Sequence, residues 1–384
     1  MRAPWNLKAV IASLLLAGCA GIVVPPSAGE KLKLAEHGVS DDTNVIVLVE
    51  TEEAANRLMI NASRGDYQLV GKRRLTGLNL ILLDFRRPKG ISSTLAVADM
   101  KRMEPSATAG VDSLYKIQQA AAQPVDPRQY ASAMIEWPQN GCPAQVSLGM
   151  IDNGVDMSAP MLASAKITSR DFASDSDAGS HGTAIASLLV GDGRLVDAHL
   201  YSANVVGGGE PGAGVFEVVA ALNWMQEMDI PLVNVSLAGP HNPVLEKAIK
   251  QATSRGMVIV AAVGNDGPSA APLYPAAFED VIAVTAVDSA LDVYDQAVRG
   301  RHIDFAAPGV DVFVEGGGYL SGTSIAAPFV TSLIASDQTL AQQNRSELIR
   351  ETVANNTVDL GAAGHDPVFG AGLIRQSQSC DLNP

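Results

Sequence analysis

Residues 144–152 read AQVSLGMID, an apolar stretch of strand length that ends in an aspartate. Similar stretches follow as AHLYSANVV (198–206), PLVNVSLAG (231–239), GMVIVAAVGN (256–265) and VIAVTAVD (281–288). Helical patterns, such as those over 215–228 and 244–255, lie between them. Strands that alternate with helices predict a doubly wound, mainly parallel α/β sheet, which we place over residues 144–384.

Four polar residues stand where such a sheet carries its chemistry. Catalytic residues gather at the carboxyl ends of parallel strands, and Asp152 and Asn265 both stand at predicted strand ends. His181 opens the helical segment HGTAIASLLVG, and Ser324 lies in LSGTSIAAPFV. A serine hydroxyl becomes a nucleophile when a base removes its proton, and an aspartate can orient that base. The order Asp152, His181, Ser324 therefore predicts a catalytic triad, although each residue taken singly could be a helix cap or a structural side chain.

The surroundings of Ser324 favour the catalytic interpretation. Gly322 permits a tight turn before the serine, and Pro328 is expected within the first turn or so of the following helix. Backbone N–H groups at such a helix start point toward a nearby anion, which suits a nucleophile.

Five segments of this domain resemble the subtilisin-like serine peptidases, the subtilase family. They are MIDNGVD, SHGTAIAS, NVSLAG, AAVGNDGP and SGTSIAAP, and they occur in the order of that family. The resemblance implies a serine endopeptidase that cuts polypeptides through an acyl-enzyme, with Asp152, His181 and Ser324 as the triad and Asn265 in the oxyanion hole. It also implies two substrate-binding edges and a pocket wall, formed by Gly212, Ala213, Gly214, Ser236, Leu237, Ala238, Gly239, Ala262, Val263 and Gly264.

Three positions depart from the usual pattern of the family. Asn153 stands where the family usually has Thr or Ser, and Ala238 and Ser187 stand where it has Gly. The methyl group of Ala238 would lie near the substrate backbone and narrow the cleft. The short segment GDGRLVDAH (191–199) omits a calcium loop that some relatives have there, and we expect no metal at this place and no cofactor.

Residues 41–118 predict a small separate domain. Their strand and helix patterns follow the order βαββαβ, which is typical of a ferredoxin-like fold, with AGVDSLYKI (109–117) as the last strand. This part carries ten acidic and eleven basic residues, whereas residues 144–384 carry 27 acidic and 11 basic ones. Its basic clusters, at 72–74 and 86–89, could dock on an acidic partner or simply be solvated strand ends.

By resemblance, residues 41–118 are the inhibitory prodomain of the family, and the ending LYKIQ supports this. Residues 119–143 are then a linker that crosses the active-site cleft and is cut there by the enzyme itself. The protein would be a zymogen with its own prodomain as an intramolecular inhibitor.

The first residues predict an export signal. MRAPWNLKAVIASLLLAGCAG combines early basic residues, an apolar run and small residues, so we assign 1–18 to a signal peptide. Leu16-Ala17-Gly18-Cys19 resembles a bacterial lipoprotein signal, in which Cys19 would be lipidated and 19–40 would be a tether; an ordinary signal peptide is the alternative. The expected location is the periplasm or outer membrane of a bacterium, as a lipid-anchored protein, or the secreted state.

The two remaining cysteines, Cys142 and Cys380, bracket the α/β domain. In an oxidising compartment we expect a disulfide between them, and two free buried thiols are the alternative. The formal net charge of −14 and the lack of a basic stripe argue against a nucleic-acid partner, and we expect a monomer.

Two other classes of protein fit parts of the sequence. VVGGGEPG holds Gly207, Gly209 and Gly212 in the spacing of a dinucleotide-binding loop, but Glu210 adds negative charge and Pro211 lacks an N–H group. A catalytically silent lipoprotein with the same fold, acting only by binding, is the second alternative.

Overall fold

The computed structural model describes residues 44–117, 120–121, 130–174, 179–207, 212–376 and 380. The predicted signal peptide, Cys19 and the tether over 19–40 lie outside these residues. Within the described part of the chain, no helix combines the length and the apolar character needed to cross a bilayer.

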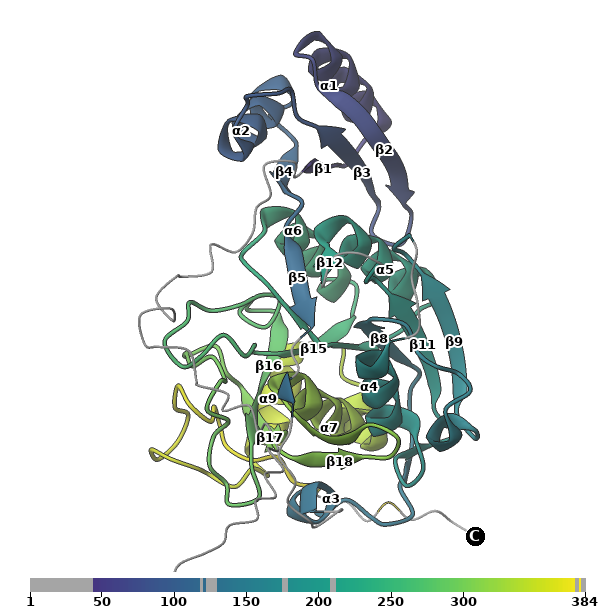
Figure 1. Ribbon diagram of the computed structural model, residues 1–384, viewed down its shortest axis with the longest axis vertical. Coiled ribbons are helices and arrows are strands. Elements are labelled where there is room, and N and C mark those ends of the chain that lie inside the picture. Colours follow the sequence, from purple (N-terminus) through teal and green to yellow (C-terminus); the bar gives the residue numbers. More distant parts are fainter. Residues whose placement is uncertain are drawn as a thin grey trace, which may run out of the picture. The chain divides into compact units, whose positions relative to one another are not determined.

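A seven-stranded sheet organises the larger part of the chain, with the strand order β17-β16-β15-β13-β8-β11-β9 (Figure 1). All neighbouring strands in it pair in parallel. In chain order the strands are β8 (Leu148–Asp152), β9 (Lys166–Asp171), β11 (His199–Asn204), β13 (Leu232–Val235), β15 (Val258–Ala262), β16 (Val281–Val287) and β17 (Phe305–Pro308). The doubly wound, mainly parallel sheet predicted from the sequence is confirmed.

Helices cover both faces of this sheet. α4 (Ser180–Val190) and α7 (Thr323–Ser336) share one apolar core, and α5 (Val215–Glu227) and α6 (Pro243–Thr253) share a second. Thirteen of the fourteen residues of α7 are buried, so this helix runs through the interior of the protein. The short helices are α3 (Tyr130–Met134), α8 (Gln338–Ala341), α9 (Ser346–Ala354) and the 3₁₀ turn Pro160–Leu162.

Strand β15 illustrates why these sequence stretches are apolar throughout. Val258 and Val260 belong to the core with α7, while Ile259 and Ala261 belong to the core with α5 and α6. Successive side chains of a strand point to opposite faces, so a strand covered on both sides has no solvent-facing position.

The N-terminal module, which we define as residues 44–111, has the element order βαββαβ. Its strands β1 (Val45–Val49), β2 (Gln68–Leu75), β3 (Leu80–Arg86) and β4 (Thr108–Val111) form a sheet in the order β2-β3-β1-β4, and each pair is antiparallel. Helices α1 (Glu52–Arg64) and α2 (Ser93–Met103) pack on one face of it. Side chains of the other face, among them Ile46, Leu48 and Leu82, pack with residues of α5 and α6.

The prediction of a single strand over 109–117 is wrong. β4 ends at Val111, and a second strand, β5 (Leu114–Ile117), joins a different sheet between β12 (Ala213–Gly214) and β14 (Leu237–Ala238). The residue at the break is Asp112, whose Oδ1 accepts a hydrogen bond from the backbone N–H of Phe216 at 3.3 Å. This capping contact takes the chain out of the β4 ladder and toward α5.

Residues predicted as a plain linker also contain regular structure. β6 (Ala120–Ala121) pairs with β19 (Gly318–Ser321), which pairs in turn with β18 (Val312–Val314), and β7 (Cys142–Pro143) pairs with β10 (Leu195–Val196).

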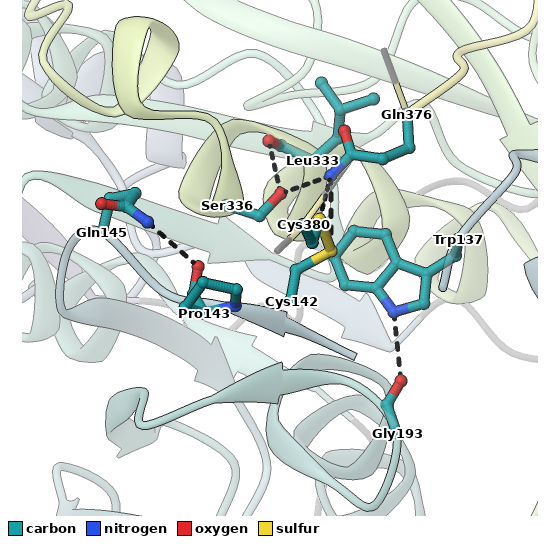
Figure 2. The surroundings of a disulfide bond; sticks show 9 residues. All are labelled: Trp137, Cys142, Pro143, Gln145, Gly193, Leu333, Ser336, Gln376 and Cys380. Carbon is teal, nitrogen blue, oxygen red and sulfur yellow. Dashed lines mark hydrogen bonds between the residues drawn. A yellow bond between two sulfur atoms is a disulfide. The ribbon is translucent and has the colours of Figure 1, made fainter. Parts of the chain in front are cut away.

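A disulfide joins Cys142 to Cys380, with the two Cα atoms 5.0 Å apart (Figure 2). The indole Nε1 of Trp137 donates to the carbonyl of Gly193 at 3.1 Å beside it. Near the same bond, Gln376 Nε2 donates to Ser336 Oγ at 3.0 Å. The expected disulfide is therefore present. It joins the segment just before the predicted α/β domain to a residue near the end of that domain.

Candidate active site

Three elements bring the predicted triad together. Asp152 is the last residue of β8, His181 is the second residue of α4, and Ser324 is the second residue of α7. His181 Nδ1 lies 2.8 Å from Asp152 Oδ1, and His181 Nε2 lies 3.0 Å from Ser324 Oγ. With a proton on Nδ1 that is donated to the carboxylate, Nε2 is left to accept from the serine hydroxyl.

All three side chains are removed from water. Asp152 and Ser324 are 0% exposed and His181 is 2% exposed. The backbone N–H of Asn153 also donates to Asp152 Oδ1, at 2.7 Å, which fixes the carboxylate at the strand end. Interactions between charges are stronger in such a dry site than in water, so the arrangement suits the stabilisation of an imidazolium.

Asn265 lies beside the start of α7. Its Oδ1 accepts from the backbone N–H of Thr323 at 3.1 Å and from Thr323 Oγ1 at 3.0 Å. Thr323 Oγ1 is also the acceptor for the N–H of Gly264, at 3.0 Å. Since the oxygen of the Asn265 amide is turned to Thr323, its Nδ2 donors lie on the other side of the amide.

Thr323 is a positioning residue that the sequence reasoning missed. The signal was present in the triplet Gly-Thr-Ser, but only the structure places the threonine against Asn265, 58 residues earlier.

The position of Pro328 was also expected incorrectly. It is the sixth residue of α7 and lies in the second turn instead of the first, where it removes one helical N–H donor.

Asn153, one of the departures from the family pattern, has a defined role. Its Oδ1 accepts from the N–H of Gly182 at 2.6 Å, next to His181 in α4. A Cβ at Gly179 or at Gly182 would collide with Asn153. The two glycines therefore make room for the asparagine, which ties the end of β8 to the start of α4.

The two predicted substrate edges flank a segment of the chain itself. β5 is the middle strand of three, and it pairs antiparallel with β12 (Ala213 opposite Tyr115) and with β14 (Leu237 opposite Ile117). A Cβ at Gly212 would lie 2.8 Å from the carbonyl oxygen of Tyr115. Gly212, one glycine of the motif noted in the sequence, thus serves a close backbone approach.

Tyr115 anchors β5 in this groove. Its side chain is 0% exposed, and its hydroxyl donates to the carbonyl of Pro240 at 2.8 Å. A Cβ at Gly239 would lie 2.9 Å from the ring, so only a glycine leaves space for the aromatic side chain there. From the sequence, Tyr115 was noted only as part of the ending LYKIQ, and Pro240 was not singled out, because neither residue type has a distinctive pattern of its own.

Three residues after the end of β5, the chain pairs again near the nucleophile. β6 places Ala120 opposite Ser321, three residues before Ser324. Two cavities among the described residues have volumes of about 750 and 870 Å³, and no triad residue is in the lining of either. The described residues also contain no cluster of three or more His, Cys, Asp or Glu side chains with metal-binding geometry.

Comparison with known proteins identifies similar chains. Residues 144–372 match the model of the Subtilase family. The chain is 31% identical over 215 residues to the Major intracellular serine protease of Bacillus subtilis, covering 50% of this chain and 67% of that protein. It is 27% identical over 293 residues to the Minor extracellular protease Epr of the same species, covering 71% of this chain and 43% of that protein.

Two solved structures have similar folds. Fervidolysin from Fervidobacterium pennivorans, described as a keratinolytic enzyme related to subtilisin, matches with a TM-score of 0.70 at 19% identity, over 87% of this chain and 60% of that one. The Epidermin Leader Peptide Processing Serine Protease from Staphylococcus aureus matches with a TM-score of 0.66 at 16% identity, over 89% of this chain and 99% of that one. The present chain therefore has a subtilisin-like fold, and it spans well under two thirds of the length of several matched proteins.

Proposed function

Because the chain belongs to the subtilase family, and both relatives above are named proteases, we propose that it hydrolyses peptide bonds with Asp152, His181 and Ser324 as its triad. The observation that carries the proposal is the chain of two hydrogen bonds, 2.8 and 3.0 Å long, from the Asp152 carboxylate through His181 to Ser324 Oγ. No cofactor takes part in this chemistry.

In the proposed reaction, His181 Nε2 takes the proton of Ser324 Oγ while the oxygen attacks the carbonyl carbon of the scissile bond. Asp152 stabilises the imidazolium that forms. The resulting oxyanion accepts hydrogen bonds from Asn265 Nδ2 and the Ser324 backbone N–H. His181 then gives its proton to the leaving amine, and a water molecule, activated by the same histidine, hydrolyses the acyl-enzyme.

The N-terminal module together with β5 is proposed to act as an inhibitory prodomain. Support comes from β5, which lies between the two edges that would bind an extended substrate, and from β6, which pairs beside the nucleophile. We expect self-cleavage in the linker that follows β5, between about residues 118 and 142. Released β5 would leave a groove that binds other polypeptides by strand addition, with little selectivity for sequence.

The predicted export signal supports a location of this activity outside the cytoplasm. Lipidation at Cys19 would attach the tether and the N-terminal module to a membrane. Self-cleavage would then release the α/β domain from that anchor, because the cut lies between the anchor and the triad.

The test compares wild type with Ser324→Ala, produced in a host that lacks the wild-type enzyme. Ser324→Ala removes the attacking oxygen without adding bulk, so the full-length exported chain should persist, whereas wild type should yield a fragment of roughly 25 kDa that begins between residues 118 and 142. Intact mass and N-terminal sequencing measure both results. Normal cleavage of Ser324→Ala would show that another protease makes the cut.

A fluorophosphonate probe separates the enzyme from a catalytically silent binding protein. Covalent labelling of the cleaved wild type, and none of Ser324→Ala, is expected, since the probe needs an activated serine. A wild-type protein that is folded, cleaved and unlabelled would favour the silent alternative.

A further inference from the structure

Two carboxylates meet where the N-terminal module contacts α5. Asp112 follows β4 and caps the first turn of α5 through the N–H of Phe216, and Glu217 is the next residue of that helix. A Cβ on Gly214 would lie 3.1 Å from Asp112 Oδ1 and would collide with Glu217 Oε2. Both carboxylates therefore crowd the same glycine, one from the module side and one from α5.

A third carboxylate, that of Asp84 in β3, faces the same helix start. A Cβ on Gly71 would lie 3.7 Å from Asp84 Cβ and 4.0 Å from the ring atom Cζ of Phe216. Asp84 Oδ2 accepts from Asn44 Nδ2 at 3.1 Å, while Asp84 Oδ1 is buried and has no hydrogen-bond partner among the described residues. The interface carboxylate cluster is thus Asp84, Asp112 and Glu217.

Two cations among the described residues act on this cluster. Arg73 of β2 lies over the ring of Phe216, 5.1 Å from its centroid, and Arg86 of β3 donates to Gln68 at 3.3 Å. The uncharged Asn242, the N-cap of α6, donates to the carbonyl of Val111, next to Asp112, at 2.6 Å. Further along α6, Lys247 is paired with the exposed Glu50 of the module at 3.0 Å.

Burial is the main reason why the three carboxyl groups favour their protonated forms. It raises the pKa of Asp84 to about 6 and the pKa of Glu217 to about 7, and the charge of Asp112 adds to both shifts. Burial also raises the pKa of Asp112, although the N–H groups of Phe216 and Val215 oppose this. Arg86 and Arg73 lower the pKa of Asp84 and Glu217, respectively, by less than burial raises it.

We propose that the protonation of Asp84, Asp112 and Glu217 controls how tightly the N-terminal module docks on the α/β domain. Docking is tight in acid and weaker toward neutral pH. This regulation rests on the proposed role of the module as an inhibitor. It would keep the cut prodomain on the enzyme in an acidic medium and release it at neutral pH.

The sign follows from linkage. A carboxyl whose pKa is raised in the docked state binds protons more tightly there than when the module is apart. Docking is therefore strongest below the ordinary carboxyl pKa near 4, and the contribution is lost as pH rises through about 6 to 7. Each pKa unit by which the docked and the separated state differ corresponds to a tenfold change in the docking equilibrium. Partial exposure of these carboxyl groups reduces this effect.

The experiment uses the full-length Ser324→Ala chain, which keeps the module attached. Hydrogen exchange at Ala213 to Phe216, where β12 meets β5 and α5 begins, reports opening of the contact. After correction for intrinsic exchange, protection should fall at least about tenfold between pH 5.5 and pH 7.5. Protection that is independent of pH over this range would overturn the proposal.

Substitutions in the same background assign the effect. Glu217→Gln combined with Asp84→Asn removes the charges, so protection at pH 7.5 should rise toward its value at pH 5.5. Glu227→Gln is the matched control, since this exposed residue ends the same helix and contacts Thr76 of the module; it should leave the pH dependence intact. An unchanged pH dependence in the Glu217→Gln/Asp84→Asn chain would contradict the assignment.

Two further outcomes keep the test decisive. If the doubly substituted chain does not fold, as judged by circular dichroism, the pH series of Ser324→Ala decides alone. If the proposed protease function is wrong, wild type stays uncut at every pH, but exchange in Ser324→Ala still tests the cluster. A pH-independent exchange rate together with normal self-cleavage would reject only the cluster.

Discussion

Tyr115 offers the sharpest test of how the N-terminal segment is held. Its fully buried ring lies over Gly239, and its hydroxyl donates to the Pro240 carbonyl at 2.8 Å. Truncation of a buried aromatic side chain to alanine costs about 3–5 kcal/mol, and a neutral hydrogen bond contributes about 1 kcal/mol. Tyr115→Ala should therefore weaken the docked state of β5 by about 3 kcal/mol or more, and Tyr115→Phe by about 1 kcal/mol.

The assay follows the appearance of peptidase activity on a fluorogenic peptide after self-cleavage. Since 1.4 kcal/mol corresponds to a factor of ten, release of the cut segment should be roughly 100-fold faster or more in Tyr115→Ala and about fivefold faster in Tyr115→Phe. The control is Leu114→Ala, because Leu114 precedes Tyr115 in β5 but is 38% exposed. Equal release rates in Tyr115→Ala and Leu114→Ala would refute the reasoning.

Three further expectations concern the reaction, the stability and the anchor. Asn265→Ala should lower kcat by roughly 10²–10³ with little change in KM, because it removes a donor that acts on the transition state; steady-state kinetics on a peptide substrate measures this, and an equal loss in KM would point to ground-state binding instead. Replacing Cys142 and Cys380 by serine should lower the free energy of unfolding by about 2–5 kcal/mol in urea titrations, and an unchanged midpoint would show that the bond contributes nothing. Cys19→Ser should move the full-length Ser324→Ala protein from the membrane to the soluble fraction, and a distribution identical to that of Ser324→Ala alone would exclude lipid attachment at Cys19.

The family and the order of the functional motifs along the chain could be recognised from the sequence, because both depend on short-range patterns. Apolar runs of strand length indicate a sheet that is covered on both faces, at whatever point of the chain they occur. Asp152, His181 and Ser324 are each marked by their own few neighbours, and the helix and strand ends they occupy follow from local periodicity. Counting the cysteines left Cys142 and Cys380 as the only candidate pair after Cys19, but free thiols remained an alternative until the structure showed the bond.

Other features depend on where distant segments meet, which local periodicity does not report. The pattern over 109–117 fits one strand, yet Asp112 caps a helix more than a hundred residues later and divides the strand between two sheets. Thr323 resembles any loop threonine until Asn265 is brought to it, and Tyr115 resembles any strand tyrosine until Gly239 leaves room for its ring.

The interface carboxylate cluster is the clearest case. Asp84, Asp112 and Glu217 are ordinary surface residue types in the sequence, and the first two belong to residues 41–118, which have slightly more basic than acidic residues. Only the packing of that module on α5 removes water from the three carboxylates together, and desolvation by neighbours far away in the sequence is what raises their pKa. The sequence alone thus determined the type of sheet and the candidate triad, whereas the tertiary structure decided what occupies the groove and which charges are buried, because burial belongs to the assembled fold and not to any one segment.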